Sequence, residues 1–259
     1  LEDISGTEKL ERYDICFEHV NFAYNKTPVL RDVSFCVPEG TTTALVGLSG
    51  SGKTTITNLI ARFWDILPGH GEISIGGKAV KTLSYEHLLK NISFVFQDVF
   101  LFNDTVLNNI RIGRPDATIE EVCEAAQRAG CAEFIEAMED SYNTVIGEAG
   151  VRLSGGEKQR ISIARALLKN APIILLDEVT ANVDAENEQL IQTALQELLK
   201  NKTVIMIAHK LSTIQNADQI LVLENGTISQ RGSHAELIAQ GGLYRRLWDI
   251  QYEAERWRM

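Results

Sequence analysis

One loop organises this chain, and its residues are Gly47-Leu48-Ser49-Gly50-Ser51-Gly52-Lys53-Thr54. They match the phosphate-binding pattern G-x-x-x-x-G-K-[ST] at every fixed position. Residues 42–46 are β-branched and apolar, and residues 55–63 carry apolar side chains at helical spacing, so the loop joins a buried strand to a helix. Glycines let backbone N–H groups approach a polyphosphate, and the helix N-terminus presents its positive end to the same anion. The alternative is a glycine-rich turn without a ligand, and the full match in this setting argues against it.

Two side chains of the loop carry the chemistry that a bound triphosphate requires. Lys53 supplies a point charge for the β- and γ-phosphates. The Thr54 hydroxyl supplies a ligand for Mg²⁺. The sequence therefore predicts a site for a nucleotide together with its magnesium ion.

The composition is typical of a globular protein with a substantial core. The chain has 259 residues, 44% of them hydrophobic, and no apolar run of the length, about 18 residues, that a membrane span needs. Acidic residues outnumber basic residues by 35 to 25, and the resulting charge of −10 argues against a surface dedicated to nucleic acid. The chain begins at Leu1 and has no methionine before Met138, so we expect it to be a segment of a longer polypeptide.

The cysteines do not suggest a metal site or a disulfide framework. Cys16, Cys36, Cys123 and Cys131 form no C-x-x-C pair and no cluster with histidines. We therefore expect small buried side chains in a reducing compartment.

The N-terminal third predicts a linker followed by a small β layer. Residues 1–12 are polar and without periodicity, which is typical of a linker. Residues 15–24 and 29–37 follow strand patterns and predict an antiparallel layer. Tyr24 lies upstream of the phosphate loop, where it could stack on a nucleotide base, although a lone tyrosine is more often part of the core.

The middle of the chain predicts strands and then a helical insertion. Residues 71–75 and 92–97 follow strand patterns, and Gln97 lies where the second strand runs out into a loop. Helical spacing covers residues 119–138, with Asp116 and Thr118 as capping candidates and Gly130 as a stop. A Ser-Gly-Gly loop at residues 154–156 then opens another helix, which implies a second anion-binding helix start.

Two further strands end in residues with catalytic potential. The apolar residues 173–176 lead into Asp177 and Glu178, at the edge where α/β sheets bind ligands. A solvated acidic turn is the alternative, but beside a phosphate loop we expect Asp177 to serve the metal and Glu178 the attacking water. Residues 203–208 lead into His209, which is placed as a γ-phosphate sensor, although a bare histidine is more often structural. Asn225-Gly226 predicts a hairpin turn, and helical patterns at 235–239 and 243–255 close the chain.

Taken together, these residues resemble the ATP-binding cassette (ABC) family, and in particular the nucleotide-binding domain of exporter-fold transporters. The resemblance runs from about residue 15 to the C-terminal helix, and residues 144–153, TVIGEAGVRL, are similar to the loop before the family signature in exporters. The residues that the resemblance assigns to ATP are Tyr24, Gly47, Ser49, Gly50, Ser51, Gly52, Lys53, Thr54, Thr55, Gln97, Ser154, Gly155, Gly156 and Asp184. The residues that it assigns to Mg²⁺ are Thr54, Gln97 and Asp177, and those that it assigns to hydrolysis are Glu178, His209, Gln97 and Lys53. Glu157 is the one departure, because family members usually carry glutamine there.

The resemblance also implies a fold and a domain arrangement. We expect an α/β P-loop NTPase with a RecA-like core sheet, an N-terminal antiparallel β layer and a helical subdomain at about residues 99–165. The linker 1–12 would lead from an upstream transmembrane domain into an ABC-type ATPase domain at residues 13–259.

The implied function is ATP hydrolysis that powers transport at the cytoplasmic face of a cell membrane. Two such domains would sandwich two ATP molecules, as a homodimer or a heterodimer, with Ser154 reaching the partner's phosphate. The alternative is a soluble ABC-type ATPase acting on nucleic acid or ribosomes. The absence of zinc-binding cysteines, the lack of room for a long coiled coil between Lys53 and Ser154, and the acidic composition argue against it. A regulatory module without turnover is a third reading, but the residues assigned to hydrolysis are all present.

Overall fold

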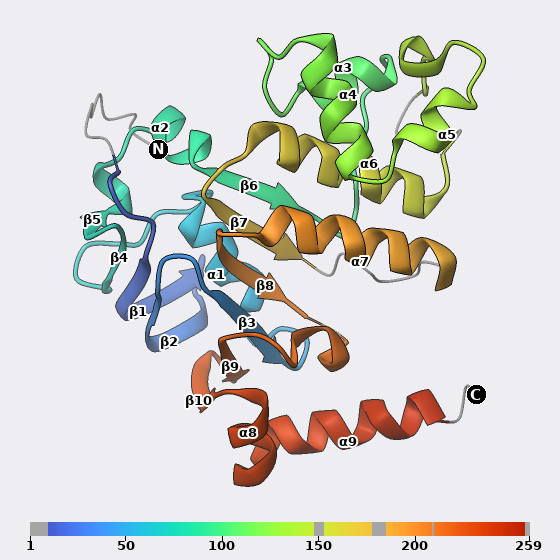
Figure 1. Ribbon diagram of the computed structural model, residues 1–259. Helices are drawn as coiled ribbons and strands as arrows, with labels where there is room; N and C mark the ends of the chain where they lie inside the picture. The colour runs from blue at the N-terminus through green and yellow to red at the C-terminus, as the bar shows by residue number, and fades with distance from the viewer. Residues whose placement is uncertain (1–9, 148–152, 178–184, 209, 257–259) are drawn as a thin grey trace. The chain divides into compact units, whose positions relative to one another are not determined.

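The computed structural model describes residues 10–147, 153–177, 185–208 and 210–256 of the chain (Figure 1). The chain divides into two compact units. The first unit comprises residues 1–92 and 201–259, and the second comprises residues 93–200.

The first unit opens with an antiparallel sheet in the strand order β2-β1-β4-β5. Its strands are β1 (Ile15–Tyr24), β2 (Thr27–Val37), β4 (Glu72–Ile75) and β5 (Lys78–Ala79). One face is buried, as the alternation of apolar side chains in β1 predicts: Ile15 and Phe17 are buried, and the Phe17 ring stacks on Phe35 at 4.6 Å. The expected N-terminal β layer is therefore confirmed.

The expectation for two of the cysteines is wrong. The antiparallel register of β1 and β2 places Cys16 opposite Cys36, with their Cα atoms 4.2 Å apart, and the structure records a disulfide between them. Cys16 is half-buried and Cys36 is exposed. A sequence pattern could not reveal this pair, because the contact depends on the register between two strands rather than on spacing. Cys131 does fit the expectation: it is buried, and burial raises the pKa of its thiol to about 12.

A largely parallel sheet carries the phosphate loop in the same unit. Its strands here run in the order β10-β9-β3-β8, with bounds β3 (Thr42–Gly47), β8 (Thr203–Ile207), β9 (Gln219–Glu224) and β10 (Thr227–Gly232). β3 is parallel to both β8 and β9, so the carboxyl ends of these strands meet at one edge. Strands β9 and β10 form the hairpin that Asn225-Gly226 predicts, and both turn residues have positive φ.

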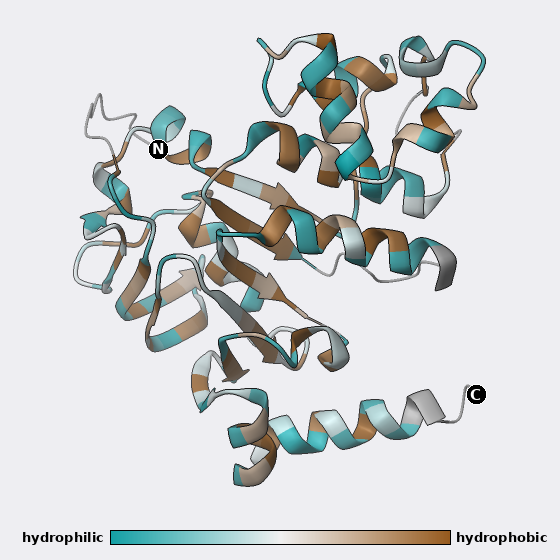
Figure 2. Cartoon of the chain, in the orientation of Figure 1, coloured by the Kyte–Doolittle hydropathy of each residue, from teal (hydrophilic) through white to brown (hydrophobic). Residues whose placement is uncertain are grey.

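The first unit also contains helices. They are α1 (Lys53–Ile60), α2 (Tyr85–Lys90), α8 (His234–Gln240) and α9 (Gly242–Arg256), with single 3₁₀ turns at Val80–Thr82 and Leu211–Ile214. Val46 of β3 and Val222 of β9 belong to a buried cluster that also contains Leu237 of α8 and Tyr244 of α9. Figure 2 shows β3 and β8 as predominantly hydrophobic strands, which fits their burial in the sheet.

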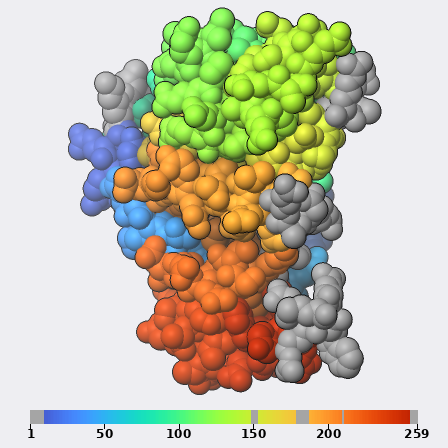
Figure 3. All heavy atoms as spheres, turned by 45° about the vertical axis from the view of Figure 1, so that its right-hand side comes forward, coloured from blue at the N-terminus to red at the C-terminus, as the bar shows by residue number. Residues whose placement is uncertain are grey.

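The second unit is mainly helical. It contains the neighbouring strands β7 (Ile173–Asp177) and β6 (Ile92–Val95). The first residue of β6, Ile92, still belongs to the first unit. Its helices are α3 (Val106–Arg111), α4 (Ile119–Arg128), α5 (Ala132–Glu136), α6 (Gly155–Lys169) and α7 (Ala185–Leu199), with a 3₁₀ turn at Ser141–Asn143. Helix α6 packs against α3, α4 and α7. In Figure 3 the green and yellow-green atoms of α3, α4 and α5 form one continuous body.

Local signals explain where the helices of this insertion begin and end. Thr118, one of the two capping candidates, caps α4 through a reciprocal box with Glu121. Gly130 adopts φ 68° just after α4, as its stop function requires. The range 99–165 expected for a helical subdomain contains α3, α4, α5 and most of α6. Across the described ranges of the chain, no helix is long and apolar enough to span a bilayer.

Candidate functional site

The phosphate loop connects the end of β3 to the start of α1. The Lys53 side chain is buried and folds back over the loop, where its Nζ donates to the Gly47 carbonyl at 2.9 Å and to the Leu48 carbonyl at 3.0 Å. Gly50 and Gly52 adopt φ 77° and 106°, values that side chains rarely tolerate. The loop thus has the strand, turn and helix setting that its pattern predicts.

Glycine is also required at two positions because neighbouring atoms leave no room for a Cβ. A Cβ on Gly47 would lie 2.2 Å from the backbone oxygen of Leu223, and a Cβ on Gly52 would lie 2.6 Å from Leu30 Cδ2. Any larger residue at either position would force the strand or the loop to move.

The loop has the features of an anion site. In the part of the chain that the structure describes, no side chain caps the N-terminus of α1, because Gly52 occupies the cap position. The Ser51 hydroxyl is buried, and its Oγ has no hydrogen-bond partner among the described residues. A phosphate would satisfy both the helix start and this hydroxyl, so the residues fit the nucleotide that the sequence predicts.

The two residues after Lys53, Thr54 and Thr55, differ in exposure. Thr54 is exposed in the first turn of α1, whereas Thr55 is buried. Among the described residues there is no group of three or more His, Cys, Asp or Glu side chains that could hold a metal. A side-chain hydroxyl is an oxygen ligand of the kind that Mg²⁺ accepts, and Thr54 offers one.

Tyr24 belongs to an aromatic cluster in the first unit. Its ring is half-buried and meets Phe22 at 4.9 Å and Trp64 at 5.1 Å, both nearly perpendicular. Sequence reasoning missed Trp64, which is half-exposed; the signal was the pair of aromatics at Phe63 and Trp64 directly after α1. Perpendicular contacts hold the Tyr24 ring in place through edge-to-face packing.

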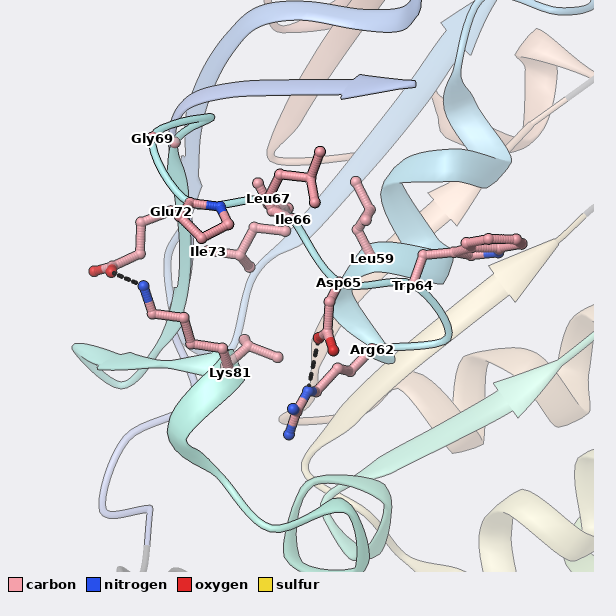
Figure 4. Close-up of a pocket in the computed structure, with 13 residues that line it drawn as sticks. Leu59, Arg62, Trp64, Asp65, Ile66, Leu67, Gly69, Glu72, Ile73 and Lys81 are labelled. Atoms are coloured by element: carbon pink, nitrogen blue, oxygen red, sulfur yellow. Dashed lines mark hydrogen bonds and ion pairs between the residues drawn. The ribbon is translucent and has the colours of Figure 1, made fainter. Parts of the chain in front are cut away.

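The hollow shown in Figure 4 is not the anion site. It has a volume of about 90 Å³, and neither the phosphate loop nor Tyr24 lines it. Its charged side chains pair with each other: Arg62 Nε donates to Asp65 at 2.8 Å, and Lys81 Nζ lies 3.4 Å from Glu72. A site in which every cation already faces a carboxylate is poorly suited to a triphosphate.

The second unit carries the other predicted residues. Gln97 is exposed two residues after the end of β6, and Asp177 is the half-exposed last residue of β7. Gln159 of α6 donates to the carbonyl oxygen of Phe96 at 3.2 Å, so the segment at Gln97 is tied to α6. Glu178, Asp184 and His209 lie outside the described residues.

Ser154 caps helix α6. Its hydroxyl accepts a hydrogen bond from the Glu157 N–H at 3.3 Å, and Glu157 Oε2 accepts one from the Ser154 N–H at 2.7 Å. Ser154 and Gly155 are exposed, while a Cβ on Gly156 would lie 2.6 Å from the Asn187 side chain. The predicted helix start therefore exists, and Glu157 places a carboxylate directly at it.

The predicted residues thus fall into two groups by unit. The loop residues 47–55 and Tyr24 belong to the first unit. Gln97, Asp177 and the signature residues 154–156 belong to the second.

Comparisons with known proteins show the family to which the chain belongs. The family model described as "ABC transporter" matches residues 30–181. The "ATP-dependent lipid A-core flippase" of Pasteurella multocida (strain Pm70) is 50% identical over 251 residues, which cover 95% of this chain and 43% of that protein. The protein of the same name from Aliivibrio fischeri (strain ATCC 700601 / ES114) is 51% identical over 242 residues, 92% of this chain and 41% of that protein.

A solved structure is also similar. "Structure of a bacterial Atm1-family ABC exporter with ATP bound" matches with a TM-score of 0.90 and 40% sequence identity, over 97% of this chain and 44% of that one. The P-loop NTPase fold expected from the sequence is therefore confirmed. The chain spans less than half the length of these relatives.

Proposed function

Because the chain belongs to the ABC transporter family, we propose that it is the ATPase domain that powers an exporter-fold transporter. ATP is the nucleotide of this family. The observation that carries the proposal is the phosphate loop, with an uncapped helix start and a buried Ser51 hydroxyl whose Oγ has no hydrogen-bond partner among the described residues. No comparison favours the alternative of an ATPase acting on nucleic acid.

Each predicted site residue has a role in this proposal. Lys53 and the backbone of residues 47–55 bind the β- and γ-phosphates, and Tyr24 stacks on adenine. Thr54, Gln97 and Asp177 would hold the Mg²⁺ that accompanies ATP, and the ion would neutralise charge on the phosphates. Glu178 orients and deprotonates the attacking water.

His209 acts as the γ-phosphate sensor. Support comes from the strand before it: β8 runs parallel to β3, and the Ala208 N–H donates to the Leu45 carbonyl at 3.4 Å. Ala208, the last described residue before position 209, therefore lies at the edge of the sheet where the phosphate loop begins.

The signature residues 154–156 act on a second copy of the domain. The exposed start of α6 would present N–H groups and the Ser154 hydroxyl to the phosphate of the partner. Two domains would then hold two ATP molecules between them, with Asp184 in the segment that crosses the dimer. Hydrolysis removes the γ-phosphate that both domains grip, and the pair opens.

A transmembrane domain on the same polypeptide is the proposed partner, which places the chain at the cytoplasmic face of a membrane. The relatives are named as flippases and an exporter, and they are more than twice as long as the matched region. Lipid A-core is the substrate in the relatives' names. For this transporter the substrate depends on residues outside the chain.

Phosphate release from ATP tests the proposal. With Mg²⁺ the purified chain should hydrolyse ATP, and Glu178→Gln should bind ATP without turnover because an amide cannot accept the proton. ATPase activity that survived in Glu178→Gln would contradict the assignment of the base. ATP binding that survived unweakened in Lys53→Ala would contradict the assignment of the loop.

A further inference from the structure

Two exposed aromatic side chains follow β6 in the second unit. Phe100 is 62% exposed and Phe102 is 52% exposed, and their rings meet edge to face with centroids 5.0 Å apart. Leu101 between them is fully buried. We call residues 100–102 the aromatic turn. Large apolar side chains gathered on a surface mark an interaction site, and under the proposed function the partner is the transmembrane domain.

Arg165 of helix α6 holds the aromatic turn. Its Nη1 donates to the Phe100 carbonyl oxygen at 2.7 Å. Its Nε donates to the Asn109 carbonyl oxygen at 2.6 Å, and its Nη2 to Asn109 Oδ1 at 2.7 Å. Burial lowers the pKa of Arg165 to about 10, still above neutral pH, so the guanidinium stays charged and all three bonds are charge-assisted.

Asn109 of α3 also binds the aromatic turn. The side chain is fully buried, and its Oδ1 also accepts from the Phe102 N–H at 2.9 Å. Its Nδ2 donates to the carbonyl oxygens of Phe102 and Thr105, each at 3.0 Å. Arg165 and Asn109 together thus bind backbone atoms at both ends of the turn.

The same helix begins at the signature. Helix α6 has 15 residues and no break, so Ser154 at its cap and Arg165 lie on one rigid rod, on the order of 16 Å apart along its axis. Gln159, between them, donates to the Phe96 carbonyl just before Gln97. Gln159 and Arg165 therefore tie the helix to the segment 96–102 at two points.

We propose that Arg165 is a positioning residue that couples the signature helix start to the aromatic turn, so that ATP bound at Ser154 changes the setting of Phe100 and Phe102. This inference rests on the proposed function, because it requires a nucleotide at the signature. The guanidinium fork is essential, since lysine keeps the charge but cannot reach three acceptors on two elements at once.

Hydrogen exchange of the whole 259-residue chain tests the coupling. Exchange is measured with and without Mg²⁺ and a non-hydrolysable ATP analogue, at residues 153–160 and 98–109. In the wild type we expect the analogue to slow exchange in both segments. In Arg165→Lys we expect the slowing at 153–160 to remain, while the slowing at 98–109 falls by about tenfold, the effect of losing one or two charge-assisted bonds.

The difference caused by the analogue separates positioning from a purely structural role. A structural residue would change exchange at 98–109 equally with and without the analogue. Arg128→Lys is the matched control, because Arg128 also joins two helices, through Glu197 at 3.1 Å, but does not touch the aromatic turn. It should leave the response of both segments as in the wild type.

Three outcomes would overturn the inference. The first is an undiminished response at 98–109 in Arg165→Lys while 153–160 responds. The second is failure of both Arg165→Lys and Arg165→Gln to fold, which would make Arg165 a structural residue. The third is a wild type in which 153–160 does not respond at all, which would also remove the proposed function.

Discussion

At the scale of single residues, Glu157 is the position where this chain departs from its family. Its carboxylate accepts the Ser154 N–H at 2.7 Å, so it stabilises the start of α6 and satisfies one of the N–H groups there. In the proposed dimer the same charge would lie near the partner's γ-phosphate. The residue would therefore favour the folded helix and oppose the ATP-bound dimer.

Glu157→Gln should separate these two effects. The glutamine oxygen can still accept the Ser154 N–H, but the like-charge repulsion, about 1 kcal/mol for a close pair in water, is removed, which is roughly a fivefold gain in affinity at each composite site. The dimerisation constant with an ATP analogue, from analytical ultracentrifugation, should tighten, and its dependence on salt should weaken. Glu157→Ala serves as the control that loses both charge and cap. An equal or weaker dimer in Glu157→Gln would contradict the electrostatic account.

In the proposed function, recognition of the base depends on Tyr24. Stacking on an aromatic ring contributes about 1–3 kcal/mol, so Tyr24→Ala should weaken ATP binding by roughly ten- to a hundredfold. Tyr24→Phe should bind nearly as the wild type, because it keeps the ring and the contacts with Phe22 and Trp64. Calorimetric titration with ATP measures both. Equal losses in the two variants would assign recognition to the hydroxyl instead.

At the scale of elements, the start of α6 offers a comparison of two adjacent glycines. A Cβ on Gly155 meets nothing within 4 Å, whereas one on Gly156 lies 2.6 Å from Asn187, a side chain that Arg160 also binds. Gly156→Ala should cost about 1–3 kcal/mol of folding stability through this clash. Gly155→Ala should not lower stability and could raise it by up to about 1 kcal/mol, since alanine favours helix.

Thermal unfolding without nucleotide measures both glycine variants. If Gly155→Ala keeps its stability but dimerises less with an ATP analogue, Gly155 serves the phosphate rather than the fold. Equal unfolding temperatures for the two variants would contradict the packing argument.

The elements show what the sequence could and could not predict. Each strand expected around the phosphate loop is present, because alternation and buried apolar runs are local signals. Strand β6 ends at Val95 rather than at Gln97, and the exposed Phe96 lies outside it. The cap at Ser154 and the turn at Asn225-Gly226 are also local and were predictable. The disulfide at Cys16 and the hold of Arg165 on the aromatic turn depend on partners 20 and 65 positions away, which no local pattern encodes.

For the whole molecule, every property that depends on nucleotide should depend on the contact between Lys53 and the γ-phosphate. Lys53 Nζ donates to the carbonyl oxygens of Gly47 and Leu48. A bound γ-phosphate would take the place of these carbonyl groups as its hydrogen-bond partner. Lys53→Ala should reduce ATP turnover by at least about a hundredfold, the loss expected when one transition-state charge contact is removed. A phosphate-release assay checks this. Turnover within a few fold of the wild type would mean that another cation holds the phosphate.

In the proposed function, ATP itself joins two copies of this chain. ADP lacks the γ-phosphate that Lys53 and the partner's signature would both hold, so only ATP should stabilise the pair, and only while it stays intact. The most direct measurement is light scattering of Glu178→Gln with Mg²⁺ and either ATP or ADP. We expect a dimer of the 28.8 kDa chain with ATP and a monomer with ADP. A monomer with both nucleotides, at concentrations where ATP is shown to be bound, would contradict it.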